Sequence, residues 1–97
     1  MIQSFADGGT ADVFNGVDSR RARRACPSNV WAVARRKLDQ LDATVSLDSL
    51  RVPPGNQLEA LKGDRRGQYS IRINDQYRIC FVWGPEGPSS VEIVDYH

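Results

Sequence analysis

Apolar side chains recur at helical spacing in the first half of the chain, most clearly in the segment that begins near Pro27. Val30, Ala34, Leu38 and Leu41 lie three or four residues apart, which places them on one side of a helix. Proline is favoured in the first turn of a helix, so Pro27 marks its start. The pattern predicts a helix with Trp31 beside its buried stripe and with these outward residues: Arg35, Arg36, Asp39 and Gln40.

Weaker signals flank this helix. Thr10 can cap a short helix that runs through Phe14 and ends at Asn15-Gly16. The basic segment Arg20 to Cys26 is either irregular or a first helical turn. The remaining predictions for the first half are a strand from Ile2 to Phe5, a turn at Asp7-Gly8-Gly9, a helical turn at Leu47 and Leu50, and a loop at Val52-Pro53-Pro54-Gly55-Asn56.

After this loop the apolar period changes from that of a helix to two, the period of a half-buried strand. Tyr69 to Ile73, Tyr77 to Trp83 and Val91 to Tyr96 are the predicted strands, and Leu58 and Leu61 flank a shorter strand or turn. The intervening loops are predicted at residues 63–67, 74–76 and 84–89. The expected architecture is α+β, with a short N-terminal strand and helices packed on a C-terminal antiparallel meander. At 97 residues the chain makes a single domain.

The register of the two central strands follows from burial. We expect pairing that aligns every bulky apolar side chain on one sheet face. Those pairs are Ile73 with Tyr77, Ile71 with Ile79, and Tyr69 with Phe81. The same register sets Arg72 opposite Arg78 on a face that need not be buried. Because opposed like charges repel, we expect a bound anion there, unless each arginine pairs locally with Asp64, Asp75 or Glu92.

Composition narrows the class of protein. No apolar run is long enough to cross a bilayer, and the N-terminal residues lack the features of a signal peptide, so we expect a cytoplasmic protein without membrane contact. Cys26 and Cys80 fit that compartment as two reduced thiols. A single histidine and two distant cysteines do not make a zinc site, and no metal or other cofactor is expected.

Charge distribution is more informative than the net charge of +1, which argues against nucleic-acid binding by bulk electrostatics alone. Basic residues form three clusters. The first two are read as solvated surface: Arg20, Arg21, Arg23 and Arg24, then Arg35, Arg36 and Lys37. The third is positioned by the predicted strands and is a candidate RNA-binding set: Lys62, Arg65, Arg66, Arg72 and Arg78.

Acid–base groups stand beside this third cluster. His97 is the last residue given and the only histidine, and it follows Asp95 and Tyr96 at the end of an apolar strand. Imidazole is the one side chain whose ordinary pKa lies near physiological pH. In an ideal strand Asp95 and His97 share a face while Tyr96 points the other way. Either the strand end twists, or Tyr96 is partly core. Acid–base groups next to cations suggest phosphate-ester chemistry.

Three segments together resemble the HigB toxins of bacterial toxin–antitoxin modules, within the RelE superfamily. They are the stretch from Leu58 to Phe81, which includes Leu-Lys-Gly-Asp-Arg and Asn-Asp-Gln-Tyr-Arg, the ending from Glu92 to His97, and the loop Pro53-Pro54-Gly55-Asn56, which fits the longer-loop subgroup. The resemblance is dense over the C-terminal half and looser before it. It implies a RelE-like fold.

By this resemblance the chain would be a small ribonuclease that cuts messenger RNA in the ribosomal A site without a metal. A cognate HigA-like antitoxin with a helix-turn-helix would hold it inactive, and operator DNA would be bound only through that complex. Asp95, Tyr96 and His97 would line the active site, with Arg78 and Lys62 on RNA phosphates. Some family members carry a histidine at the position of Glu59, whereas related RelE-type toxins use a glutamate as base in a similar region.

The residues support the same chemistry on their own. Metal-free RNA cleavage needs a base for the 2′-hydroxyl, an acid for the leaving 5′-oxygen, and cations for the charge on phosphorus. His97 can be base or acid, with Glu59 or Asp95 as its partner, and Tyr96 can donate to phosphate or stack on a base. A competing hypothesis is a non-catalytic module that binds RNA or protein through the same arginine face.

Overall fold

A four-stranded antiparallel sheet, with strands in the order β1-β2-β3-β4, forms the C-terminal half of the protein. The structure is a computed structural model that describes residues 1–96, and His97 lies outside the described residues. The strands are β1 (Glu59–Ala60), β2 (Gln68–Arg72), β3 (Tyr77–Gly84) and β4 (Gly87–Asp95). Each strand pairs with the next one in the chain, which confirms the predicted meander.

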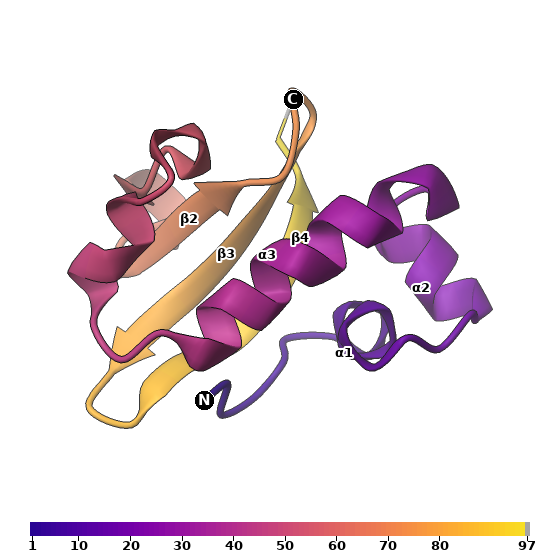
Figure 1. Cartoon of the computed structure of the whole chain (residues 1–97), viewed down its shortest axis with the longest axis horizontal. Helices are drawn as coiled ribbons and strands as arrows, with labels where there is room; N and C mark the ends of the chain where they lie inside the picture. Colours follow the sequence, from indigo (N-terminus) through magenta and orange to yellow (C-terminus); the bar gives the residue numbers. More distant parts are fainter. Residues whose placement is uncertain (97) are drawn as a thin grey trace.

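The helices come before the sheet in sequence and cover one of its faces. They are α1 (Gly8–Asn15), α2 (Arg20–Ala25) and α3 (Trp31–Ala43). Figure 1 shows α3 running obliquely across the sheet, with α1 and α2 to one side of it. Short 3-10 helices are η1 (Ser28–Val30), η2 (Leu47–Arg51), η3 (Pro54–Asn56) and η4 (Gly63–Arg65). The expected α+β class is confirmed.

The core lies between α3 and the sheet. Ala34, Leu38 and Leu41 have no exposed surface, as the helical spacing predicted. They pack with fully buried residues of the strands, among them Ile71, Ile79, Phe81 and Val91. Trp31 is only half-buried at the edge of this core, where its indole Nε1 donates to the carbonyl of Cys26 at 2.9 Å.

Both cysteines are buried free thiols, Cys26 in this core and Cys80 on the other face of the sheet, where it pairs with Ser70 and Glu92. Burial raises the pKa of Cys26 to about 11 and also raises the pKa of Cys80. A thiol reacts as its thiolate, so a raised pKa lowers the reactive fraction of both side chains at neutral pH.

The predicted register of β2 and β3 is confirmed. Tyr69 pairs with Phe81, Ile71 with Ile79, and Arg72 with Arg78. The backbone N–H of Ile73 also donates to the Tyr77 carbonyl at 2.9 Å. In the connecting turn the Asn74 side chain accepts from the backbone N–H groups of Gln76 and Tyr77, at 2.9 and 2.7 Å. This side-chain turn fixes the register that burial requires.

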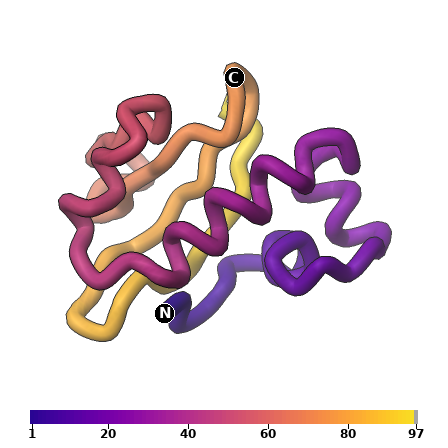
Figure 2. The backbone as a smooth tube through the Cα atoms, in the orientation of Figure 1, coloured from indigo at the N-terminus to yellow at the C-terminus, as the bar shows by residue number. Residues whose placement is uncertain are grey.

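The predicted strand from Ile2 to Phe5 is reduced to one parallel bridge, between Phe5 and Val91. The segment still lies along β4, since Gln3 N donates to the Pro88 carbonyl and Val91 N to the Ser4 carbonyl, at 2.8 and 3.1 Å. In Figure 2 the first residues run beside β4 before the chain turns away.

Two segments predicted as loops contain regular secondary structure. Residues 84–89 were expected to form a loop, but Gly84 pairs with Gly87 and β4 begins at Gly87. Gly87 adopts a φ of 123°, which an L side chain rarely does, so the chain can reverse within two residues. The predicted loop at residues 52–56 contains the short helix η3, which begins at Pro54.

The sequence predicted the first helix near the N-terminus correctly but assigned it the wrong N-cap. The cap of α1 is Asp7, whose carboxylate accepts from Thr10 N at 2.6 Å, and not Thr10. The Thr10 hydroxyl instead accepts from Ile93 N at 3.0 Å in the core. α1 ends at Asn15 with Gly16 as its left-handed cap, as predicted. The segment after Arg20 is a full short helix, because Ser19 caps it by accepting from Ala22 N at 3.0 Å.

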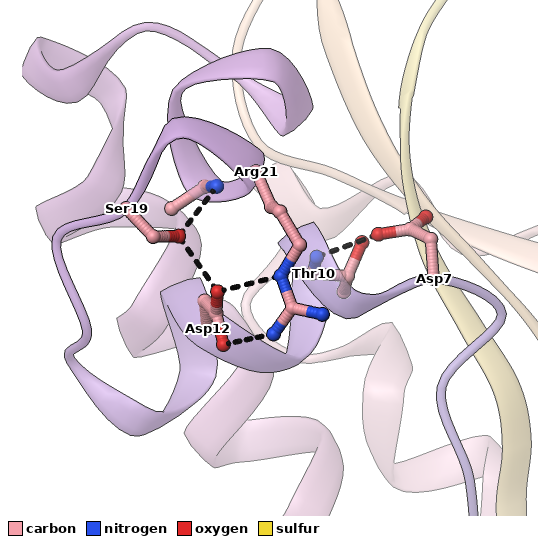
Figure 3. A network of polar contacts seen from close by, with 6 residues as sticks. Asp7, Thr10, Asp12, Ser19 and Arg21 are labelled. Atoms are coloured by element: carbon pink, nitrogen blue, oxygen red, sulfur yellow. Dashed lines mark hydrogen bonds and ion pairs between the residues drawn. The ribbon is translucent and has the colours of Figure 1, made fainter.

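A polar network joins α1 to α2 (Figure 3). The guanidinium of Arg21 donates to both carboxylate oxygens of Asp12, at 2.9 and 3.1 Å, and the Ser19 hydroxyl donates to the same carboxylate at 2.6 Å. These donors lower the pKa of Asp12 below its ordinary value, the bonds from Arg21 most and that from Ser19 next. The two helices approach so closely that a Cβ on Gly9 would lie 2.4 Å from the Arg21 carbonyl oxygen.

We expect Asp12→Asn to lower the free energy of unfolding at pH 7. The amide loses the ion pair with Arg21 and one of the two oxygens that accept hydrogen bonds. Because the folded-state pKa of Asp12 is lowered, its contribution is complete above the ordinary value of 3.8 and is lost as pH falls below it. Urea unfolding at pH 7 and pH 3 measures the difference between wild type and variant, which should shrink at pH 3. The control is Asp48→Asn, whose partner Arg51 is exposed. An equal difference at both pH values contradicts this account.

Candidate active site

Polar side chains meet on the face of the sheet that α3 does not cover, near the end of β4. Strand pairing sets Glu59 opposite Ser70 on this face. The Tyr96 hydroxyl lies 3.4 Å from Oε1 of Glu59, and the guanidinium carbon of Arg78 lies 5.5 Å from the centre of the Tyr96 ring. A cation over an aromatic face is attracted by the ring quadrupole, so Arg78 and Tyr96 stabilise each other's position.

Tyr96 borders a hollow of about 450 Å³ whose other lining residues are Glu59, Ala60, Leu61 and Lys62. We call Glu59, Lys62, Arg78 and Tyr96 the outer site. It combines a carboxylate, a phenol and two cations, of which Glu59, Lys62 and Tyr96 are exposed. Such a set can bind an anionic oxygen and move a proton close to it.

Arg78 differs from the other cations of this face because it is buried, with 7% of its surface exposed. Its Nε donates to the Ser70 hydroxyl at 2.8 Å, and one Nη donates to the Gln57 carbonyl at 2.6 Å. Among residues 1–96 no carboxylate forms an ion pair with it. Both acceptors are neutral, so the guanidinium keeps its full charge for a bound anion.

The expectation of an anion bound between the opposed arginines stays a prediction, and the two side chains have different partners. Arg72 forms an ion pair with Asp75 in the β2–β3 turn, and Arg78 turns to neutral oxygens. The alternative of local pairing was therefore right for Arg72. Arg65, which is not one of the opposed pair, forms an ion pair with Glu92 at 3.2 Å. Arg66 is exposed beside Arg65, at the end of η4.

Asp95 lies away from the outer site. It pairs with Tyr77 in the ladder, and its carboxylate accepts from Gln76 Nε2 at 3.1 Å. It lines a second hollow, of about 410 Å³, together with Arg21 and Arg24 of α2. Burial and the nearby Asp95 charge raise the pKa of Tyr77. Strand alternation thus continues to the end of β4, and Tyr96 is not core, since 45% of its surface is exposed.

Comparison with known proteins decides the family. A family described as "RelE-like toxin of type II toxin-antitoxin system HigB" matches residues 3–97. This chain belongs to the HigB-like toxin family. The suspected resemblance is confirmed, and the match covers the helical half as well as the sheet. The chain is therefore a toxin of a type II toxin–antitoxin system, and an antitoxin is its partner.

Two relatives of this HigB-like toxin show how far the likeness extends. Toxin HigB-1 of Vibrio cholerae serotype O1 is 46% identical over 66 residues, which is 68% of this chain and 68% of the relative. An uncharacterized protein of Haemophilus influenzae is 46% identical over 57 residues, or 59% of this chain and 56% of that protein.

Sequence reasoning placed His97 at the centre of the site, and that residue lies outside the described residues. Within residues 1–96 no three cysteine, histidine or carboxylate side chains gather as a metal site would require. No helix of the same residues is long and apolar enough to span a membrane.

The contribution of Ser70 and of the Gln57 carbonyl to holding Arg78 was not foreseen. The predicted register did contain a signal for Ser70, because it alternates with Ile71 and so shares the face of Arg78. Nothing in the sequence pointed to a backbone carbonyl in the loop before β1.

Proposed function

We propose that this HigB-like toxin is a ribosome-dependent endoribonuclease that cuts messenger RNA in the A site by metal-free acid–base catalysis. The observation that carries the proposal is the buried guanidinium of Arg78, held by neutral acceptors and adjoining the hollow that Glu59, Lys62 and Tyr96 line. A fixed cation beside an open, polar hollow suits a reaction in which negative charge grows on phosphate.

In the proposed reaction the substrate supplies its own nucleophile. The 2′-oxygen attacks the adjacent phosphorus as a base removes its proton, and the P–O5′ bond breaks as an acid protonates the leaving oxygen. The products are a 2′,3′-cyclic phosphate and a 5′-hydroxyl. No oxidant, metal or cofactor is required, and the pentacoordinate intermediate needs only cations and proton donors around its oxygens.

Each residue of the outer site has a role in this reaction. Arg78 stabilises the charge on the phosphoryl oxygens, and Lys62 at the rim of the hollow binds a phosphate of the chain. His97 and Glu59 are the acid–base pair, and the Tyr96 ring stacks on a base or donates to phosphate. Asp95 faces the other hollow, so its role is to orient the strand end and not to move a proton.

The remaining cations act at longer range. Arg65, Arg66 and Arg72 surround the site and contact RNA backbone, and their ion pairs with Glu92 and Asp75 open when phosphate replaces the carboxylate. A net charge of only +1 is enough because the ribosome delivers the substrate. The proposed partner in the inactive state is a HigA-like antitoxin with a helix-turn-helix, and the complex binds operator DNA.

Induced expression separates this function from a non-catalytic module that binds RNA or protein through the same face. We expect wild-type expression to arrest growth, and co-expression of a helix-turn-helix protein encoded beside it to restore growth. His97→Ala should be tolerated at equal protein levels. Tolerated expression of the wild type would favour the binding module, and so would arrest by His97→Ala as strong as by the wild type.

A further inference from the structure

Arg78 depends on a backbone carbonyl for its orientation. Its Nη donates to the Gln57 carbonyl at 2.6 Å, the shortest of its hydrogen bonds within residues 1–96. The other Nη makes no hydrogen bond to those residues. The direction of the Gln57 carbonyl therefore decides where the free edge of the guanidinium points.

Gln57 holds that carbonyl in an uncommon backbone conformation. Its φ of 46° and ψ of 55° are left-handed, a region that residues other than glycine, asparagine and aspartate seldom adopt. The Gln57 side chain is exposed. Gln57 is the C-cap of η3, and its backbone N–H donates to the Pro54 carbonyl at 3.1 Å, so the residues before it hold this conformation.

The preceding residue, Asn56, is polar and yet has no exposed surface. Its Nδ2 donates to the Leu50 carbonyl and to Oε1 of Gln40, both at 3.1 Å. Its Oδ1 accepts from the ammonium of Lys37. A buried carboxamide with donor and acceptor both satisfied is rigidly held, because leaving either group unpaired would be costly.

These partners tie the loop to the helical layer. Lys37 and Gln40 belong to α3, and Leu50 belongs to η2. The Lys37 side chain reaches Asn56 although burial, and repulsion from Arg36 and Arg72, lower its pKa. Asn56 is thus fixed by two elements that contribute no residue to the outer site.

We propose that the segment Asn56-Gln57 is a positioning element for the reaction. Asn56 anchors the loop to α3 and η2, Gln57 presents its carbonyl from the left-handed conformation, and that carbonyl aims the free edge of Arg78 at the substrate phosphate. The inference rests on the proposed function, because it gives Arg78 the role of stabilising phosphoryl charge.

Two substitutions of the exposed Gln57 test the proposal with little change in packing. Gln57→Gly permits the left-handed conformation, whereas the β-branched side chain in Gln57→Val opposes it. We expect Gln57→Val to raise the hydrogen-exchange rate of Arg78 Nε–H, measured by NMR, by about tenfold or more. The reason is that the guanidinium would lose its hydrogen bond to the Gln57 carbonyl. We expect Gln57→Gly to leave that rate within about twofold of wild type, because its carbonyl keeps its place.

The same variants are compared in single-turnover cleavage of ribosome-bound messenger. We expect the rate at saturating toxin to fall about 10- to 100-fold in Gln57→Val, since misplacing a catalytic group by an ångström has effects of that size. The toxin concentration at half-saturation should stay within about twofold, because ribosome contacts are untouched. If the loop had only a structural role, Gln57→Val would lower the melting temperature. It would not selectively lower the rate at saturation while leaving the half-saturating concentration unchanged.

Asn56→Asp provides the second test. It keeps the shape and the acceptor for Lys37 but removes the donors to Leu50 and Gln40. We expect the same rise in Arg78 exchange and the same fall in rate. If this variant does not fold, the Gln57 pair decides.

The results distinguish failure of this inference from failure of the proposed function. Unchanged Arg78 exchange in Gln57→Val overturns the positioning role, whatever the nuclease assay gives. Faster exchange with an unchanged cleavage rate overturns both the positioning role and the catalytic use of Arg78. If the wild type does not cut at all, the proposed function fails, and the exchange rates still decide whether Asn56-Gln57 holds Arg78.

Discussion

Arg78→Ala is expected to slow cleavage of ribosome-bound messenger by about two to three orders of magnitude, the usual effect of removing one stabilising donor from a developing oxyanion. The guanidinium is the only buried cation of the outer site, and neutral acceptors hold it there. Single-turnover cleavage at saturating toxin gives the rate. The loss should appear in that rate and not in the toxin concentration at half-saturation.

The same substitution also affects stability, because it leaves the Ser70 hydroxyl and the Gln57 carbonyl without their donor. A loss of about 1–3 kcal/mol in the free energy of unfolding is expected. Ser70→Ala is the matched control, since it removes one of these acceptors and keeps the cation. It should lower stability by a similar amount and the rate far less. Cleavage by folded Arg78→Ala at near wild-type rate would show that Arg78 does not stabilise the transition state.

His97→Ala is expected to slow cleavage by about two to four orders of magnitude, the range for loss of a general acid or base. Imidazole is the one group of the proposed site that gives and takes protons readily near neutral pH. The core ends before it, since Ile93 is the last buried residue of β4. The free energy of unfolding should therefore remain within about 0.5 kcal/mol of wild type.

Two controls show whether His97 acts through its proton. His97→Gln keeps a polar side chain that cannot transfer protons, and it should be as slow as His97→Ala. In the wild type the cleavage rate should depend on pH through titration of the imidazole, and His97→Gln should lose this dependence. A normal rate in His97→Ala, or loss of activity together with unfolding, would contradict a catalytic role.

The sequence was sufficient for the central hairpin because burial leaves one acceptable register. Placing Tyr69 opposite Phe81 and Ile71 opposite Ile79 turns all four toward the core, and a shift by one residue would turn them away. The α3 stripe of Ala34, Leu38 and Leu41 was predictable for the same reason. Where one face must be apolar, spacing alone determines which residues meet.

Polar groups were harder to place because their partners are chosen by distance in three dimensions. Asp95, Tyr96 and His97 are adjacent in sequence, yet alternation sends Asp95 toward α2 and Tyr96 toward Glu59. Arg78 was expected on an open face and is instead buried against a loop carbonyl. No propensity marks Gln57 for a left-handed conformation, so this contact requires the folded structure.

The short turn between β3 and β4 and the short helix α2 were also hard to predict from the sequence. A proline–glycine run reads as a loop, yet Gly84 to Gly87 close a tight hairpin, because the positive φ of Gly87 allows it. The basic segment Arg20 to Cys26 reads as irregular or as a first helical turn, and its residues Arg20–Ala25 form a helix with a Ser19 cap that packs closely on α1. In each case a local feature, a glycine with positive φ or a side-chain cap, selects the conformation.

Cleavage mapping in a reconstituted translation reaction tests the central claim most directly. Purified toxin is added to one messenger, either free in solution or on ribosomes stalled with a defined codon in the A site, and the new 5′ ends are mapped by primer extension. We predict cuts within the A-site codon that move with the stall position, are absent from free messenger, and are lost with His97→Ala. Cuts that are equal in free and ribosome-bound messenger, or no cuts by wild-type toxin, would contradict a ribosome-dependent endoribonuclease.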